Sequence, residues 1–375
     1  MFLQQLQLFC FRNYLEQKVN FDANKTILLG DNAQGKTNLL EAVELMATLK
    51  TQRAKKDQDL ILEGKEESRI LASLERSYGS TEVAMTLRSS GKRSISLNQE
   101  NLRRHLDLLG VVNTVQFSSL DLELVRGAPE VRRNWLDALL VQLEPVYAYI
   151  IQQYHKILRQ RNALLKQLYK QNSPPVADHL TELGIWDAQL AAFGSRVIRR
   201  RARVLTRLTP LAQNWHQQIS GNTELLEINY SPNVCYSLDE PQQVQQAFLV
   251  AISDRSVIEQ QLATTVVGPH RDDIELLINQ TPAKSYGSQG QQRTLVLSLK
   301  LAELDLIEQI IGESPILLLD DVLAELDLHR QNQLLEAISS RCQTLITTTH
   351  LNSFEQDWLK AAQILSVKAG SIHME

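Results

Sequence analysis

The sequence predicts an α/β protein in which strands from both ends of the chain form one sheet around an inserted, mainly helical lobe. Near the N-terminus an apolar strand runs through a glycine-containing loop into a helix, and near the C-terminus two apolar strands flank another helix. Between them, residues 129–209 have helical periodicity. Alternating strands and helices indicate a parallel sheet. The expected lobes are residues 1–105 and 266–375 for the sheet and 106–265 for the insertion.

Period-2 alternation and short apolar runs predict the N-terminal strands. A turn is expected at residues 12–14, and the run at 89–91 is typical of a hairpin turn. A helix is expected from about Lys36, because Leu39 and Val43 recur at helical spacing. The expected strands are residues 2–10, 19–21, 26–29, 69–76, 82–88 and 93–97.

The rest of the chain changes character twice. Pro174 and Pro175 interrupt the helical stretch and predict a long helix on either side. Residues 224–280 return to mixed β character, and Gly312 is expected to end the helix that follows them. The expected later elements are a helix at 288–311, a buried strand at 316–319, a helix at 328–338 and a strand at 344–348.

The charge balance excludes a globally basic protein. The chain of 375 residues has 39 Lys and Arg against 43 Asp and Glu, and its formal net charge is −4. The basic residues are nevertheless gathered, since residues 126–207 hold 14 Lys and Arg against 6 Asp and Glu. A nucleic-acid partner would therefore have to contact a local patch.

The cysteines and the apolar runs indicate where the protein works. Cys10, Cys235 and Cys342 form no C-x-x-C pair, which argues against a disulfide framework and a zinc site and favours a reducing compartment. Apolar runs fall far short of the roughly 18 residues of a membrane span. Residues 1–20 lack the basic leader and apolar core of a signal peptide. A cytoplasmic protein without membrane segments is expected.

The strongest motif is a glycine-rich loop between the strand at 26–29 and the following helix. Residues 30–37, GDNAQGKT, satisfy G-x-x-x-x-G-K-[ST] in the strand–loop–helix context that the motif requires, which disfavours a chance match in a turn. Backbone N–H groups there can cradle phosphates, Lys36 can reach the β- and γ-phosphates, and Thr37 can bind Mg²⁺. The expected ATP-binding residues are Gly30, Asp31, Asn32, Ala33, Gln34, Gly35, Lys36, Thr37 and Asn38.

A second motif ends the buried strand at 316–319. Asp320 and Asp321 follow this strand directly, which is the Walker B arrangement. Asp320 would bind Mg²⁺ directly or through water, and Asp321 could orient or deprotonate the attacking water. An ordinary core strand with a polar turn is the alternative, which the glycine-rich loop disfavours. With Lys36 and His350, these aspartates are the catalytic candidates.

The separation of the two motifs distinguishes between classes of P-loop protein. Asp320 lies 284 residues after Lys36, whereas compact nucleotide kinases and small GTPases keep these motifs closer together. The large insertion matches an ATP-binding-cassette (ABC) head. Such a head predicts a signature loop before the helix that leads to Walker B. The residues expected there are Ser288, Gln289, Gly290 and Gln291, with a plain helix cap as the alternative.

Three further positions fit the ABC pattern. Residues 324–327 follow Walker B, where a D-loop is expected. His350 follows the strand at 344–348, the position of a switch histidine that senses the γ-phosphate, although a lone histidine is more often an ordinary surface or core residue. Gln116 is a candidate Q-loop residue and metal ligand, although glutamine at a strand end is common.

The ABC pattern also implies a second copy of the chain. In ABC heads the signature loop of one subunit faces the P-loop of another. A chain with one of each cannot complete its own site, so ATP is expected to join two copies into a homodimer.

Several blocks of the sequence resemble the RecF family of bacterial recombination mediators, and the resemblance covers nearly the whole chain. The matching blocks are FRNY at 11–14, GDNAQGKTNLLEA at 30–42, G-x-P-x-x-R-R-x-x-L-D at 127–137, YHKILRQRNALLK at 154–166, GPHRDD at 268–273 and SQGQQR at 288–293. The departures are TQR for SHR at 51–53, FSSLDL for FSPEDL at 117–122, and Ala324 for a common Ser. They concern local loop geometry rather than the fold.

The resemblance implies an ATPase lobe related to SMC heads and a second, helical lobe. It implies a protein that dimerises on ATP, binds DNA and works with RecR and RecO to help load RecA at gaps. Recombinational repair, replication restart and the SOS response are the implied processes, and ATP and Mg²⁺ the implied cofactors. A weak, DNA-stimulated ATPase is expected, because Asp321 is shorter than the Glu of many cassette ATPases.

A run of arginines in the basic segment is the candidate DNA contact, for single-stranded, gapped or junction DNA. These residues share a helix face by i+3 and i+4 spacing, and Arg201 adds to the run. A solvated helix face is the alternative. Since no base-reading motif is present, backbone and junction-shape recognition is favoured. The candidates are Arg196, Arg199, Arg200, Arg203 and Arg207.

Two other classes of function are left open. The ATP-binding subunit of a transporter shares the P-loop, the signature and the switch histidine, but the basic insertion and SQGQQ in place of LSGGQ disfavour it. A non-hydrolysing, nucleotide-gated scaffold would keep all its activities after Asp321→Ala.

Overall fold

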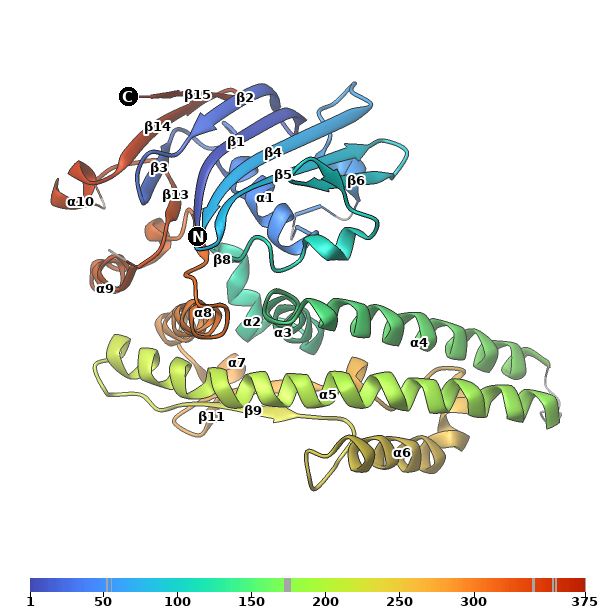
Figure 1. Cartoon of the computed structure of the whole chain (residues 1–375). Coiled ribbons are helices and arrows are strands. Elements are labelled where there is room, and N and C mark those ends of the chain that lie inside the picture. The colour runs from blue at the N-terminus through green and yellow to red at the C-terminus, as the bar shows by residue number, and fades with distance from the viewer. Residues whose placement is uncertain are drawn as a thin grey trace. The chain divides into compact units, whose positions relative to one another are not determined.

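The computed structural model describes residues 1–374 apart from 52, 55, 172–176, 339–340, 353 and 355. The chain divides into two compact units, each made of separate stretches of sequence (Figure 1). Unit 1 consists of Met1–Leu122, Leu211–Glu224 and Ser288–Glu375, and unit 2 of Glu123–Pro210 and Leu225–Gly287. An α/β head with an inserted, mainly helical second unit is therefore confirmed.

A mostly parallel sheet in unit 1 joins the two ends of the chain. Its strands are β3 (Lys25–Leu29), β8 (Thr114–Ser118), β12 (Ile316–Asp320), β13 (Thr344–Thr348), β14 (Gln363–Lys368) and β15 (Ser371–Met374). The order is β15-β14-β3-β13-β12-β8, and only the β14–β15 hairpin is antiparallel. The prediction that both ends build one sheet is confirmed.

A second, antiparallel sheet of unit 1 precedes the insertion. Its strands, in the order β2-β1-β4-β5-β6-β7, are β1 (Phe2–Phe11), β2 (Tyr14–Asn20), β4 (Glu67–Arg76), β5 (Gly79–Arg88), β6 (Arg93–Leu97) and β7 (Glu100–Asn101). Helix α1 (Lys36–Thr48) shares one buried cluster with both sheets, since Leu39 packs in the same core as Leu6 of β1 and Leu28 of β3. This burial fixes the start of α1 relative to the strand ends.

The remaining helices of unit 1 include α8 (Gln289–Ile311), whose boundaries are those that local chemistry predicts. The others are α9 (Leu328–Ile338) and α10 (Gln356–Lys360), with the short turns η1 (Asp57–Leu60), η2 (His105–Leu108), η3 (Ser119–Leu122) and η5 (Leu323–Glu325). Ser288 caps α8, because its hydroxyl accepts from the backbone N–H of Gln291 at 3.2 Å. Gly312 ends α8 in the left-handed conformation, with φ 79°.

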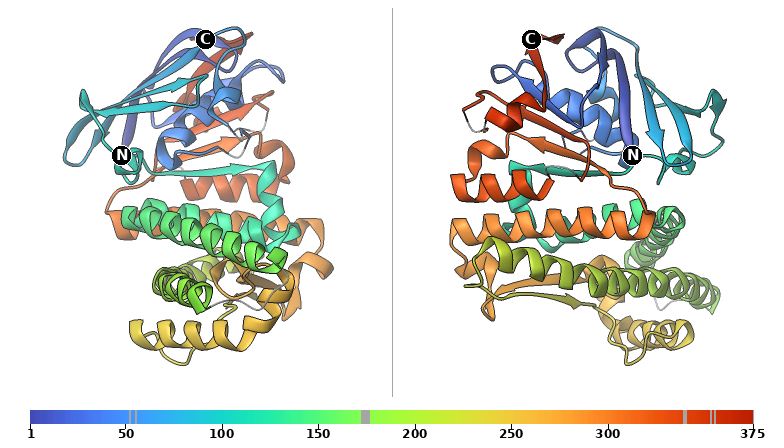
Figure 2. Two further views of the ribbon diagram at one scale, coloured as in Figure 1. Left: turned by 90° about the vertical axis from the view of Figure 1, so that its right-hand side faces the viewer. Right: turned by 60° about the vertical axis from the view of Figure 1, so that its left-hand side comes forward.

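Helices make up most of unit 2, and the longer ones are drawn in green and yellow in Figure 2. Its helices are α2 (Glu123–Arg126), α3 (Pro129–Leu143), α4 (Pro145–Gln171), α5 (Ala177–Ile219, of which the part from Leu211 belongs to unit 1), α6 (Pro241–Leu262), α7 (Ala283–Tyr286) and the turn η4 (Pro269–Arg271). A small antiparallel sheet joins them, in the order β11 (Thr281–Pro282), β10 (Asp273–Ile278) and β9 (Leu226–Ser231). The expected breaks at Pro174 and Pro175 lie outside the described residues.

The mixed β character expected for residues 224–280 is wrong in its middle, where α6 forms. Pro241 occupies the first turn, and Val244, Phe248 and Ile252 are buried at helical spacing. Runs of glutamine and β-branched residues obscure this period in the sequence.

The units are also bounded differently from the expected lobes 1–105, 106–265 and 266–375. Strand β8 belongs to unit 1 because it pairs with β12, and residues 266–287 belong to unit 2 because β10 pairs with β9. The hydrophobic periodicity of a sequence does not indicate which distant strands pair with each other.

Two global features bear on the sequence-based expectations. The three cysteines are unpaired thiols; Cys235 is exposed and Cys342 is buried. Among the helices that the structure describes, none has both the length and the apolar character of a membrane span.

Candidate nucleotide-binding site

Parallel strands of unit 1 bring the predicted motifs to one edge of the sheet. The register pairs Thr347 of β13 with Leu28 of β3 on one side and with Asp320 of β12 on the other. The glycine-rich loop, the Walker B aspartates and His350 all lie at or just after the carboxyl ends of these three strands. Ligands of open parallel sheets bind at such an edge.

The glycine-rich loop leads directly into α1. Its last residue, Gly35, is the N-cap of α1 with φ 117°, and an added Cβ would lie 2.7 Å from Asn13 Nδ2. A residue with a side chain would strain the backbone at this φ and would displace the Asn13 amide. The first N–H groups of α1 lack intrahelical partners and carry the positive end of the helix dipole, so the loop is suited to an anion.

Lys36 folds back over the loop. Its Nζ donates to Gly30 O at 2.6 Å and to Asp31 O at 3.0 Å, and the residue is buried. The ammonium group therefore contacts the backbone of the glycine-rich loop. Phosphate oxygens of a bound nucleotide can replace the two carbonyls as its acceptors.

Thr37 and the Walker B strand meet through a shared carboxylate. Thr37 Oγ1 donates to Asp320 Oδ1 at 2.7 Å, and Thr347 Oγ1 donates to the same oxygen at 2.9 Å. Burial raises the pKa of Asp320, while these two hydroxyls partly offset the rise. A hydroxyl and a carboxylate at this point form the oxygen donor set that Mg²⁺ prefers, so the residues present fit this metal.

Asp321 adopts an unusual backbone conformation beside this carboxylate. Its φ is 53°, in the left-handed region, and its N–H donates to Thr347 Oγ1 at 2.8 Å. Residues with side chains in that region concentrate at functional sites. The bond to Thr347 keeps Asp321 at the carboxyl edge of the sheet, next to Asp320.

The D-loop and the switch-histidine position occupy the same edge. Asp327 Oδ1 accepts from the backbone N–H of Arg330 at 3.0 Å, so it caps the start of α9. His350 is exposed, and its backbone carbonyl accepts from Thr348 Oγ1 at 2.9 Å. The structure therefore places His350 after β13, as predicted.

Gln116 lies inside β8 rather than at its end. It is paired with Leu318, two positions before Asp320. In the orientation that satisfies both its polar atoms, its amide nitrogen donates to Glu44 Oε1 and Oε2 of α1 at 2.8 and 3.0 Å. Its role as a metal ligand stays a prediction.

Sequence reasoning missed the buried charges next to this site. Lys300 of α8 contacts Asp121 Oδ1 and Glu303 Oε1, both at 3.1 Å. Burial lowers the pKa of Lys300, but the two carboxylates outweigh it and the net shift is upward. Burial and neighbouring carboxylates, Glu41 first, raise the pKa of Glu44 to about 8. The signal in the sequence for these buried charges was a lysine, Lys300, within the apolar run of α8.

The expected signature residues lie at the exposed start of α8. Ser288 and Gln289 are exposed, and Gly290 and Gln291 are half-buried. Ser288 N donates to Gln291 Oε1 at 2.9 Å, which completes the capping box. Ser288 therefore forms the helix cap that was the alternative to a signature role. Because Ser288 is exposed, the cap leaves room for an additional role.

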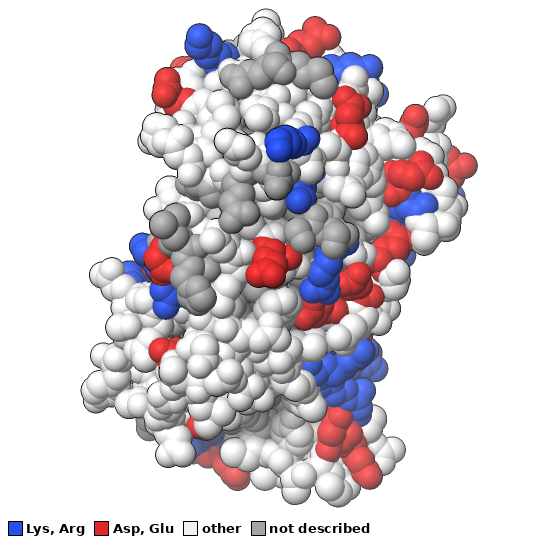
Figure 3. Space-filling view, turned by 90° about the vertical axis from the view of Figure 1, so that its left-hand side faces the viewer, with Lys and Arg blue, Asp and Glu red and all other residues white. Residues whose placement is uncertain are grey.

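The five candidate DNA-contacting arginines lie on α5 in unit 2. Arg199 Nε and Arg203 Nε donate to the two oxygens of Asp239, each at 2.5 Å. Arg200 Nε donates to Glu144 at 3.0 Å, Arg196 lies over the ring of Phe193, and Arg207 is exposed. On the face of the molecule that Figure 3 shows, basic side chains lie in small groups with acidic ones close by, and most of the surface is uncharged.

Arg201, in the same run, is a buried structural residue. It forms ion pairs with Asp137 at 2.9 Å and with Asp272 at 3.2 Å. These partners lie in the blocks G-x-P-x-x-R-R-x-x-L-D and GPHRDD. Arg201, which was counted in the arginine run but not among the candidate DNA contacts, is therefore buried within unit 2.

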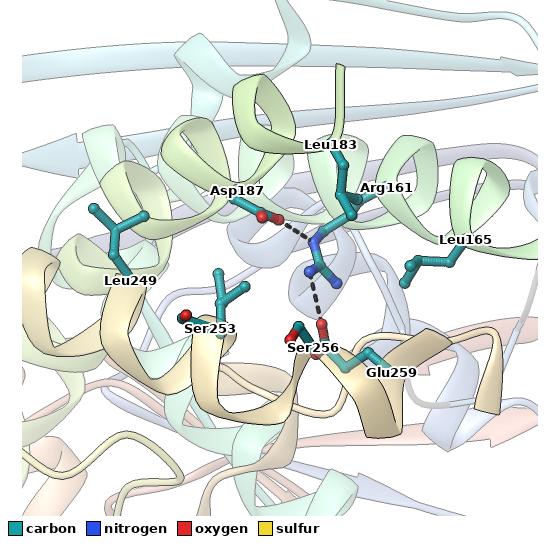
Figure 4. A pocket seen from close by; sticks show the side chains of 9 residues that line it. Arg161, Leu165, Leu183, Asp187, Leu249, Ser253, Ser256 and Glu259 are labelled. Carbon is teal, nitrogen blue, oxygen red and sulfur yellow. Dashed lines mark hydrogen bonds and ion pairs between the residues drawn. The ribbon is translucent and has the colours of Figure 1, made fainter. Parts of the chain in front are cut away.

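Unit 2 also contains a cavity of about 220 Å³, lined by α4, α5 and α6 (Figure 4). Arg161 lies in its wall and is 1% exposed, with Asp187 and Glu259 each 2.6 Å away. Arg161 Nη1 also donates to Thr265 Oγ1 at 2.8 Å. The block at 154–166 thus ties the three helices together, and the predicted nucleotide residues are not in this cavity.

The fold and the site define an α/β P-loop ATPase head with a helical insertion. A family model described as the RecF/RecN/SMC N terminal domain matches residues 2–372. The Smc head domain from Pyrococcus furiosus, 13% identical with a TM-score of 0.55 over 100% of this chain and 96% of that chain, shares the fold.

Closer relatives specify the family. DNA replication and repair protein RecF from Gloeothece citriformis is 65% identical over 381 residues, covering 99% of both chains, and its counterpart from Rippkaea orientalis is 65% identical over 378 residues, covering 100% of both. A solved structure of the recombination mediator protein RecF with ATP in the RecFOR pathway has 30% identity and a TM-score of 0.91, over 100% of this chain and 97% of that one. The chain belongs to the RecF family.

Proposed function

We propose that this chain is an ATP-dependent DNA-binding protein that acts in recombinational repair, replication restart and the SOS response in the cytoplasm. The observation that carries the proposal is the meeting of Thr37 with Asp320 beside a glycine-rich loop closed by Lys36. The names of its relatives support the pathway, and RecR, RecO and, through them, RecA are the proposed partners.

ATP binding is proposed to work as a switch with slow hydrolysis. The loop N–H groups and Lys36 bind the phosphates, and Thr37 and Asp320 hold Mg²⁺, which when bound neutralises phosphate charge. Asp321 positions the attacking water and accepts its proton. The side chain of Asp321 is short and its backbone N–H is bonded to Thr347, which supports slow hydrolysis. DNA binding is proposed to increase the rate.

The switch is proposed to join two copies of the chain. Residues 288–291 are at least partly accessible at the start of α8. The N-terminus of that helix would offer N–H groups to the γ-phosphate held by the second copy, and His350 would sense the same phosphate. A dimer would also double the basic surface of α5, which explains how an acidic chain can bind DNA phosphates.

ATP turnover of the wild type and Asp321→Ala, with and without gapped DNA, tests this proposal. We expect weak hydrolysis in the wild type, a severalfold increase with DNA, and loss of hydrolysis with retained ATP binding in the variant. Equal turnover in both proteins would contradict the role of Asp321. A wild type that binds ATP and never hydrolyses it would instead indicate the nucleotide-gated scaffold.

A further inference from the structure

Two hairpin turns of unit 1 meet the glycine-rich loop at Gln34. From the β1–β2 turn, Asn13 Nδ2 donates to Gln34 O at 2.9 Å. From the β14–β15 turn, Gly370 N donates to the same carbonyl at 3.0 Å, and Ala369 N donates to Gln34 Oε1 at 2.7 Å. Gln34 is therefore held through its main chain and its side chain by segments from both ends of the chain.

A further bond fixes the next carbonyl of the loop. Tyr14 OH donates to Gly35 O at 2.9 Å, beside the N–H of Leu39 in α1, which donates to the same oxygen at 3.2 Å. Tyr14 is fully buried, and burial raises the pKa of its hydroxyl, so it remains a proton donor at neutral pH. Asn13 Oδ1 accepts from Asn38 Nδ2 at 2.8 Å, which ties the same turn to the first turn of α1.

The turns and the loop are in direct contact. An added Cβ on Gly370, whose φ is 75°, would lie 2.3 Å from Asn13 O, so the two turns also touch each other. An added Cβ on Gly35 would lie 3.1 Å from the hydroxyl oxygen of Tyr14. The contacts leave little space for the loop to change conformation on this side.

The bonds to the carbonyls determine where the N–H groups point. In a planar trans peptide the C=O of one residue and the N–H of the next point in opposite directions. Holding Gln34 O toward the two turns therefore directs the N–H of Gly35 away from them. Holding Gly35 O toward Tyr14 does the same for the N–H of Lys36. These N–H groups begin α1 and are the donors that a phosphate would meet.

We propose that Asn13, Tyr14 and the β14–β15 turn are positioning residues that fix the N–H groups of the glycine-rich loop for phosphate binding. The inference rests on the proposed ATP binding of that loop and extends it to residues outside the motif. When one donor is lost, Gln34 O keeps only Gly370 N and Gly35 O keeps only Leu39 N, so the peptide is less restrained. The apparent ATP affinity then falls with the fraction of loops in the competent orientation.

Asn13→Ala and Tyr14→Phe test the proposal. Asn13→Ala removes the donor to Gln34 O together with the acceptor for Asn38 Nδ2, and Tyr14→Phe removes only the donor to Gly35 O. The Kd of Mg-ATPγS is measured by calorimetry, together with KM and kcat for ATP. We expect each variant to raise Kd and KM by about 3- to 10-fold, the range for one net hydrogen bond, while kcat changes less than about 2-fold. Asn98→Ala is the matched control, because Asn98 bonds Glu82 N in another turn of the same sheet.

Lys36→Ala and thermal unfolding without nucleotide complete the experiment. Wild-type binding that Lys36→Ala abolishes supports the proposed function on which the inference rests, and a wild type that does not bind Mg-ATPγS would overturn both. Unchanged Kd in Asn13→Ala and Tyr14→Phe, with wild-type binding intact, would overturn the positioning role alone. A lowered Tm with unchanged Kd would also overturn it, because these residues would then support only the fold.

Discussion

Thr37 and Asp320, 283 positions apart in the chain, share a hydrogen bond of 2.7 Å at the carboxyl edge of one parallel sheet. The bond places a hydroxyl from the start of α1 on a carboxylate from the end of β12. The helical insertion between them in sequence does not prevent the meeting, because β13 pairs with both β3 and β12.

Removing the Thr37 hydroxyl should impair metal-dependent hydrolysis. In Thr37→Ala, Asp320 keeps Thr347 as a donor, but the metal loses one oxygen ligand. We expect ATP turnover to fall by about 10²-fold or more, on the scale of other losses of transition-state stabilisation, and the Mg²⁺ concentration for half-maximal rate to rise. Thr37→Ser keeps the hydroxyl and serves as the control. Full activity in Thr37→Ala would contradict the metal role.

The buried carboxyl of Glu44 should make stability depend on pH. Its pKa is about 8 in the folded protein against an ordinary value of 4.5. The folded state therefore binds the proton more tightly, and this stabilisation, complete below about pH 4.5, declines as pH rises to 8. Its size is a few kcal/mol.

Glu44→Gln removes that dependence. Urea unfolding at pH 6 and pH 9 should show the variant gaining stability relative to the wild type at the higher pH. The exposed Glu66→Gln provides the control for loss of one carboxyl. A difference between Glu44→Gln and the wild type that stays constant from pH 6 to pH 9 would show that Glu44 titrates normally.

Ser288 should contribute to stability through its cap. Ser288→Ala removes the acceptor for the Gln291 N–H and should cost about 1 kcal/mol of unfolding free energy. Ser288→Thr keeps the hydroxyl and should stay near the wild type. If Ser288→Thr retains stability but loses ATP-dependent assembly, the added methyl group obstructs a contact that residue 288 makes beyond the cap.

Asp239 should compete with DNA for Arg199 and Arg203. It occupies both guanidinium groups, so Asp239→Asn should tighten DNA binding by severalfold. Replacing both arginines with Ala should reduce the slope of log K against log salt by about 2, near one unit for each lost phosphate contact. Fluorescence anisotropy with gapped DNA measures both, and Arg104→Ala is the control for an exposed arginine of unit 1. If the salt dependence of the double variant equals that of the wild type, DNA does not contact Arg199 and Arg203.

Local chemistry explains which features the sequence could predict. The starts of α1 and α8 are marked by Gly35 and Ser288, and the end of α8 by Gly312, because caps depend on neighbouring residues. The glycine-rich loop and the Walker B motif, each at a strand end, predicted which edge of the parallel sheet holds the site. These signals lie within a few residues of the features they predict.

Features that depend on distant partners were not predictable. Arg201 differs from Arg199 only through burial against Asp137 and Asp272. The contact of Gln34 with the β14–β15 turn joins residues 336 positions apart. No periodicity encodes such pairs, and their recognition requires the folded chain.

The central claim, an ATP site completed by two copies, is tested most directly by sedimentation of mixed variants. Lys36→Met damages the P-loop and Ser288→Arg the signature. In a mixture, the P-loop of the Ser288→Arg chain can still face the intact signature of the Lys36→Met chain. We predict that each variant alone stays monomeric with Mg-ATP and that the mixture forms dimers with one intact site. ATP-dependent dimers of Ser288→Arg alone, or a mixture that stays monomeric while the wild type dimerises, would contradict the claim.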